Sequence, residues 1–68
     1  MHVNLLKGKL RENAMTQEAV AEKMGISLSR FNAKLNEREG AEFSLGEVKA
    51  LKTILGLTAK QTEQIFFT

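Results

Sequence analysis

The chain contains no cysteine, proline, tryptophan or tyrosine, and its single histidine is His2. Without cysteine it can form neither a disulfide nor a thiolate metal site, and one imidazole cannot build a zinc site or a histidine-dependent triad. No apolar run approaches the roughly 18–20 residues that span a bilayer, and no signal-peptide core follows Met1. Because small secreted domains usually depend on disulfides, we expect a cytoplasmic protein that binds no cofactor or membrane and is not an enzyme.

The remaining composition is that of one small globular domain over residues 1–68. Hydrophobic residues make up 43% and charged residues 26%, which favours a folded chain over a disordered one. With no proline and five glycines, the chain lacks the turn residues that a sandwich or barrel needs. The net charge of +2 is uneven, since residues 1–38 carry +3 and residues 39–68 carry −1. Any nucleic-acid face is therefore expected in the first half.

Apolar spacing and capping residues divide the chain into five short helices, with no strand of useful length. The predicted segments are 4–13, 17–24, 27–36, 44–55 and a last helix from residue 58. Their expected N-caps are Asn4, Thr16, Ser27, Ser44 and Thr58, the last two in capping-box patterns. Residues 37–43 are expected to form a loop, and Gly25 and Gly56 are expected to end their helices in left-handed turns. The fold class is therefore all-α.

Residues 17–36, QEAVAEKMGISLSRFNAKLN, have the spacing of a helix-turn-helix. Two helices that cross through a short turn need a small residue where their backbones approach, and Ala21 is suited to that position. Gly25 supplies the turn, while Phe31 and Leu35, four residues apart, form the buried stripe of the second helix. The outer side of this helix can then enter a major groove about 12 Å wide.

This segment resembles the helix-turn-helix of the bacteriophage repressor and Cro family, the lambda-repressor-like DNA-binding domains. The likeness includes the Thr-Gln that opens the first helix, the serine cap of the second and the asparagine that closes it. It continues from Val48 to Thr58, which is similar to the family's fourth helix and following turn, and residues 65–67 are similar to the aromatic end of very short phage-encoded Cro-like proteins. The resemblance implies a five-helix domain that occludes a promoter by binding operator DNA in a bacterial cell.

The resemblance also implies which side chains contact bases. At the start of the recognition helix and along its outer side they are Ser27, Leu28, Ser29, Asn32 and Ala33. An asparagine can pair with two atoms of adenine, and an apolar side chain can contact a thymine methyl. A helical wheel with Phe31 and Leu35 inward turns Leu28 toward the core, so a place at the rim of the core is equally open for it. Lys34 departs from the family pattern, which has an apolar residue there.

Phosphate contacts are expected from a second set of residues: Gln17, Arg30, Lys34, Asn36 and Arg38. Gln17 and Asn36 match backbone-contacting positions of the family, and free amides at a helix N-terminus attract an anion. The three basic residues are candidates because they cluster around one helix. Taken singly, each is better explained as a solvated charge.

One copy of so small a domain contacts few phosphates, so we expect a homodimer that binds two half-sites about 34–36 Å apart. The candidate dimer surface is Ile65, Phe66 and Phe67, with Phe67 the exposed member; a frayed end that covers the core is the alternative. A protein-interaction module, such as an antirepressor or adaptor, is the competing function, while an antitoxin or restriction controller would also bind DNA. No small-molecule effector is expected, because so short a chain leaves no room for an effector pocket.

Overall fold

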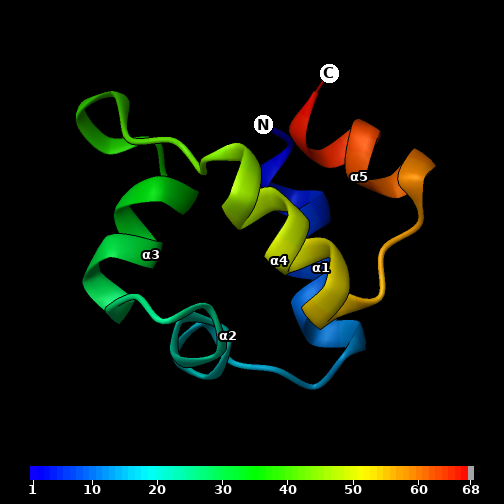
Figure 1. Cartoon of the computed structure of the whole chain (residues 1–68), viewed down its shortest axis with the longest axis horizontal. Helices are drawn as coiled ribbons and strands as arrows, with labels where there is room; N and C mark the ends of the chain where they lie inside the picture. Colours follow the sequence, from blue (N-terminus) through cyan, green and yellow to red (C-terminus); the bar gives the residue numbers. More distant parts are fainter. Residues whose placement is uncertain (68) are drawn as a thin grey trace.

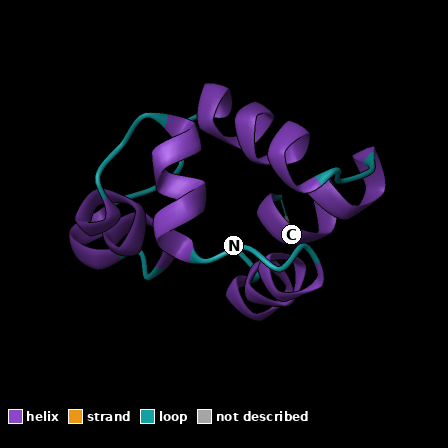
Figure 2. Cartoon of the chain, turned by 90° about the horizontal axis from the view of Figure 1, so that it is seen from below, coloured by secondary structure: helices purple, strands orange, loops and turns teal. Residues whose placement is uncertain are grey.

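The computed structural model describes residues 1–67 and contains five α-helices, one short 3-10 helix and, in this part of the chain, no strand (Figure 1 and Figure 2). The α-helices are α1 (Val3–Glu12), α2 (Gln17–Met24), α3 (Leu28–Leu35), α4 (Leu45–Leu55) and α5 (Ala59–Phe66), and the 3-10 helix η1 spans Arg38–Gly40. The all-α prediction is thus confirmed. None of these helices combines the length and the apolar character that crossing a membrane requires.

Side-chain caps define the starts of the helices. The predicted caps that the structure confirms are Thr16, Ser27, Ser44 and Thr58. Each hydroxyl oxygen accepts a hydrogen bond from the amide three residues further on, at 3.0–3.2 Å. Glu47 and Gln61 complete the two capping boxes, because their side chains accept hydrogen bonds from the amides of Ser44 and Thr58.

The first helix starts earlier than the sequence predicts. His2, rather than Asn4, is the N-cap of α1, and its Nδ1 accepts a hydrogen bond from the Leu5 amide at 3.4 Å. The His2 amide donates to the Ile65 carbonyl at 2.6 Å, which holds the start of α1 against the end of α5. Figure 1 and Figure 2 both show the two chain ends close together. This contact between distant segments selects His2, although asparagine is the stronger cap by local preference.

A single core joins the helices. Its buried side chains are Leu6, Leu10, Val20, Ala21, Phe31, Leu35, Leu51, Leu55, Leu57 and Ile65. Helix α2 packs against α3 and α4, while α5 packs against α1 and α4. Phe31 and Leu35 are fully buried, as their spacing predicts, so the opposite side of α3 faces outward.

The segment predicted as a loop, residues 37–43, contains η1 and returns to the core through Phe43. The Phe43 ring lies 5.5 Å from the ring of Phe31 and 6.2 Å from that of Phe66, measured between centroids. Tilted and edge-on pairs of this kind are favourable arrangements of aromatic rings. The aromatic row therefore connects α3 to α5 and holds the chain in place just before α4 begins.

Left-handed backbone closes the tight connections. Gly25, with φ 76°, ends α2 and Gly56, with φ 63°, ends α4, as predicted. Three residues that carry a Cβ, namely Ala14, Glu37 and Glu39, also have a φ of 52°. This conformation costs such a residue about 1–2 kcal/mol, because the Cβ approaches the following carbonyl oxygen. The turns around these residues are therefore strained.

We expect Ala14→Gly to raise the free energy of unfolding by about 0.5–1 kcal/mol. Glycine adopts a positive φ without the Cβ clash, and this gain exceeds the extra entropy that glycine gives the unfolded chain. Urea denaturation measures the change. The control is Ala50→Gly inside α4, where the backbone is helical and glycine should instead lower the free energy of unfolding. Equal losses in both variants would show that Ala14 is not strained.

Candidate nucleic-acid interface

Helices α2 and α3, joined by residues 25–27, carry most of the residues that were predicted to contact DNA. The exposed members of the set are Ser27, Leu28, Ser29, Arg30, Asn36 and Arg38, and the half-buried members are Gln17, Asn32, Ala33 and Lys34. Because Phe31 and Leu35 are buried, the opposite side of α3 faces outward in its first turn. We call the surface that these exposed and half-buried residues form on α2 and α3 the α2–α3 face.

A row of hydrogen-bonded carboxamides crosses the α2–α3 face. Asn32 Nδ2 donates to Gln17 Oε1 at 3.2 Å and so joins α3 to the start of α2. Asn36 Nδ2 donates to the main-chain carbonyl of Asn32 at 2.9 Å and to Asn32 Oδ1 at 3.3 Å. Within residues 1–67, the NH2 group of Gln17 and Oδ1 of Asn36 have no partner, so they remain able to bind an external group. The sequence predicted that these residues contact DNA but did not indicate the hydrogen bonds among them.

The carboxamide row limits what Asn32 can do. Pairing with adenine N6 and N7 uses both the NH2 group and the oxygen of an asparagine. Here the NH2 group already donates to Gln17 and the oxygen already accepts from Asn36. One N–H and one oxygen lone pair are left on Asn32. A base would therefore meet an Asn32 side chain whose orientation is set in advance by its two neighbours.

Lys34 forms an ion pair with Glu47. Its Nζ lies 2.7 and 2.6 Å from the two carboxylate oxygens of Glu47 at the start of α4. The two side chains are only 15% and 19% exposed. The pair links α3 to the start of α4. The charge of Lys34 is thus neutralised within the fold, and its predicted contact with a phosphate stays a prediction.

Glu47 connects three parts of the fold. Besides pairing with Lys34, its Oε1 accepts a hydrogen bond from the Ser44 amide at 2.8 Å, as the capping box requires. Burial acts to raise the pKa of Glu47, but hydrogen bonds from Lys34 and Ser44, with the charge of Lys34, outweigh it and lower the pKa below its ordinary value. The sequence identified Glu47 only as a cap, because a contact between two separate helices has no characteristic spacing.

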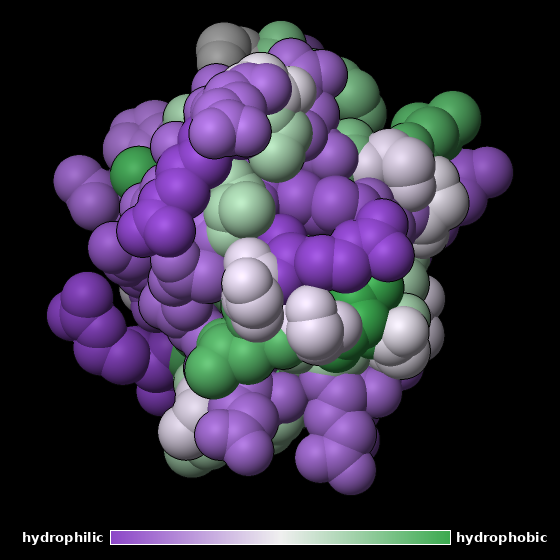
Figure 3. Space-filling model, turned by 90° about the vertical axis from the view of Figure 1, so that its left-hand side faces the viewer, coloured by the Kyte–Doolittle hydropathy of each residue, from purple (hydrophilic) through white to green (hydrophobic). Residues whose placement is uncertain are grey.

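With Lys34 paired to Glu47, Arg30 and Arg38 are the exposed cations of the predicted phosphate set that have no carboxylate partner within residues 1–67. Figure 3 views the molecule from the α3 side and shows a mainly hydrophilic surface with an apolar patch in its lower part. Leu28 is 43% exposed and Ile26 is half-buried in the turn before α3. Leu28 thus lies largely outside the core and is accessible to a ligand.

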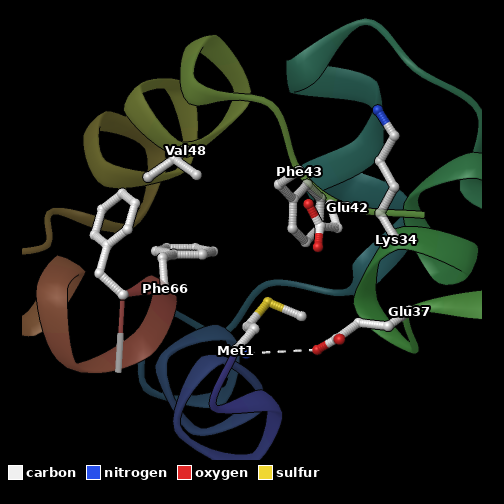
Figure 4. Close-up of a pocket in the computed structure, with 8 residues that line it drawn as sticks. Met1, Lys34, Glu37, Glu42, Phe43, Val48 and Phe66 are labelled. Carbon is white, nitrogen blue, oxygen red and sulfur yellow. Dashed lines mark ion pairs between the residues drawn. The ribbon is translucent and has the colours of Figure 1, made fainter. Parts of the chain in front are cut away.

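Only part of the predicted dimer surface is accessible. Ile65 is 1% exposed and belongs to the core, which corrects its assignment to an interface, whereas Phe67 is 61% exposed. Phe66 is half-buried and, with Phe67, Phe43 and Val48, lines a hollow of about 280 Å³. Figure 4 shows Phe66 of α5, Val48 of α4 and Phe43 of the segment before α4 around this hollow. A hollow of this size was not expected from so short a chain.

Comparison of the chain with models of protein families, with curated proteins and with solved structures finds no match. The resemblance of residues 17–36 to the phage repressors therefore stays a prediction. Within residues 1–67, no three His, Asp or Glu side chains gather into a group that could hold a metal ion. The function has to be inferred from the geometry of the α2–α3 face and from the residues that form it.

We expect Glu47→Gln to lower the free energy of unfolding at neutral pH by about 1–3 kcal/mol, because it leaves the largely buried Lys34 ammonium without its partner charge. The pKa of Glu47 is lower in the folded chain than in the unfolded chain. Its stabilising contribution is therefore complete above the ordinary carboxylate pKa and is lost as the pH falls through the lowered value. Urea denaturation between about pH 3 and pH 7 measures both effects, and the variant should lose less stability in acid.

The matched control for this experiment is Glu63→Gln. Glu63 is exposed on α5 and its side chain has no ion pair within residues 1–67. Its substitution should leave the stability at neutral pH and the acid response almost unchanged. An equal loss in the two variants would mean that the Lys34–Glu47 pair does not stabilise the fold.

Proposed function

We propose that the chain is a sequence-specific regulator that binds double-stranded DNA, with α2 and α3 as a helix-turn-helix and α3 as the helix that enters the major groove. The observation that supports this most strongly is the carboxamide row of Gln17, Asn32 and Asn36 beside the exposed start of α3. Neutral donors and acceptors of fixed orientation suit both base edges and phosphate oxygens. Because residues 17–36 resemble the helix-turn-helix of the phage repressor and Cro family, we further propose that the regulator is a Cro-type repressor that occludes a promoter.

Base contacts are proposed for the first turns of α3. Ser29 is exposed, and its hydroxyl can both donate to and accept from base edges. Leu28 and Ala33 provide apolar contact for a thymine methyl group. As the helix cap, the Ser27 hydroxyl oxygen accepts a hydrogen bond from the Arg30 amide. Its O–H can still donate a hydrogen bond to a base. Asn32 acts from within the carboxamide row.

Phosphate contacts are proposed on either side of these base contacts. The unpaired NH2 group of Gln17 lies at the start of α2, where free amides favour an anion. Asn36 lies just after α3, and the exposed Arg30 and Arg38 supply positive charge. Arginine binds phosphate oxygens through two parallel hydrogen bonds, which fixes position as well as adding affinity. These contacts would place α3 in the groove without determining sequence preference.

A second copy of the chain is the partner proposed for the hollow beside α5. An exposed aromatic ring, Phe67, is part of the lining of this hollow. The other lining residues include Phe43, Val48 and Phe66 on the apolar side and Lys34, Glu37 and Glu42 on the charged side. A two-fold axis at this place would let each Phe67 cover the hollow of the other copy, because both copies use the same surface. Such a pair would present two α3 helices to successive half-sites, about 34–36 Å apart.

A protein-interaction module is the alternative function, and one observation favours it. Leu28 at the start of α3 is exposed and Ile26 in the turn before it is partly exposed, while Lys34 of α3 is neutralised by Glu47. A surface with apolar residues and little net charge suits a protein partner as well as DNA. The response to salt separates the two functions, because only binding to DNA releases the counterions that its phosphates hold.

We expect the chain to bind the duplex upstream of its own gene, with an affinity that falls steeply between about 50 and 200 mM salt. Replacing both Ser29 and Asn32 with alanine should cost about 1–3 kcal/mol of preference for this duplex over an unrelated one. Fluorescence anisotropy with both duplexes measures this preference. Thr53→Ala is the control, since Thr53 is exposed on α4, a helix that the proposal does not place against DNA.

An unchanged preference in the Ser29 and Asn32 variant would contradict the assignment of α3 as the base-contacting helix. Binding to neither duplex at low salt would contradict the DNA-binding function itself and would favour the protein-interaction module. The Thr53→Ala control should have the same affinity and the same preference as the unaltered chain.

We expect the chain to sediment as a dimer and Phe67→Ser to sediment as a monomer, because the substitution removes the exposed ring that would cover the partner's hollow. Analytical ultracentrifugation over a range of concentrations gives the mass. Leu5→Ser is the control, since Leu5 is an exposed apolar residue of α1 outside the lining of the hollow. A dimer that persists in Phe67→Ser, or an unaltered chain that is always monomeric, would contradict this arrangement.

A further inference from the structure

A second hollow lies between the C-terminal half of α1 and the start of α2, and we call it the α1–α2 groove. Its volume is about 300 Å³, and it is lined by Lys7, Leu10, Arg11, Met15, Thr16 and Gln17. The lining thus holds two cations and no acidic residue. Gln17 belongs both to this groove and to the carboxamide row, so the groove continues the α2–α3 face onto α1.

The two cations of the groove are not used by the fold. Lys7 and Arg11 are four residues apart on α1, which places them on one side of the helix about one turn from each other. Within residues 1–67, neither has a carboxylate partner or a side-chain hydrogen bond. By contrast, Lys9 of the same helix pairs with Glu12 at 3.0 Å. Two neighbouring positive charges without counterions favour the binding of an anion.

The shape of the groove and its polar groups indicate which anion fits. Arg11 is exposed and can hold two oxygens of a phosphate group at once, while the half-buried Lys7 acts as a point charge. The unpaired NH2 group of Gln17 adds a neutral donor at the end nearest α3. Donors therefore follow one another along the surface from α1 to α3, which suits a ligand with successive phosphates.

We propose that the α1–α2 groove binds the phosphodiester backbone of duplex DNA and extends the protein–DNA contact beyond α2 and α3 to Lys7 and Arg11. This inference depends on the proposed function and adds a second backbone contact to it. Glu47 neutralises the charge of Lys34 on the α2–α3 face. Lys7 and Arg11 supply positive charge in its place. The groove contributes affinity for any sequence and no preference among sequences.

The test is the salt dependence of DNA binding by the double variant Lys7→Ala, Arg11→Ala. We expect its affinity for the specific and the unrelated duplex to fall by the same factor, about tenfold or more at moderate salt, with an unchanged ratio between them. The slope of log K against log salt should become shallower by about 1–2. Lys9→Ala is the matched control: it removes a cation of the same helix that already has a partner, and it should leave the slope unchanged.

The outcomes separate the groove from the proposed function. If the unaltered chain binds DNA and the double variant keeps its slope, the groove proposal is overturned and the proposed function stands. If the unaltered chain binds no duplex, both are overturned. The variant Lys7→Gln, Arg11→Gln keeps the side-chain length and gives the same test if the alanine variant folds poorly.

Discussion

Phe31 is the largest of the fully buried side chains, and its burial determines how α3 faces the rest of the domain. Leu35, one turn later, presses the same side of α3 into the core, and the Phe43 ring packs 5.5 Å from that of Phe31. The opposite side of α3 then has to face outward. A domain of 68 residues without disulfides has little stability to lose, so the whole α2–α3 face depends on this small apolar contact.

Polar contacts determine which charges of the basic half remain available. The net charge of +3 on residues 1–38 includes Lys34. That charge is neutralised by an ion pair with Glu47, which belongs to the acidic half and to α4. The outer surface is left with neutral carboxamides and with cations such as Arg30, Lys7 and Arg11 that have no partner within residues 1–67. A modest net charge thus leaves cations without carboxylate partners on this surface, because the charge of Lys34 is neutralised by Glu47.

Most of the helix boundaries could be predicted because the interactions that create them are local. A capping hydroxyl and its amide are three residues apart, and a left-handed glycine acts within its own turn, so Ser44 and Gly56 were identifiable from sequence alone. The predicted start of α1 was wrong because the His2 amide donates a hydrogen bond to the carbonyl of Ile65 in α5. No pattern around Asn4 contains that information.

The sequence by itself determined the fold class, the order of the five helices and the inward side of α3, since apolar spacing and caps act over one or two turns. The tertiary structure decided which surface residues are free to act. It buried Ile65 and left Phe67 exposed, paired Lys34 with Glu47, and joined Gln17 to Asn32. Each of these depends on the distance between side chains from different helices, and that distance exists only once the helices have packed around a common core.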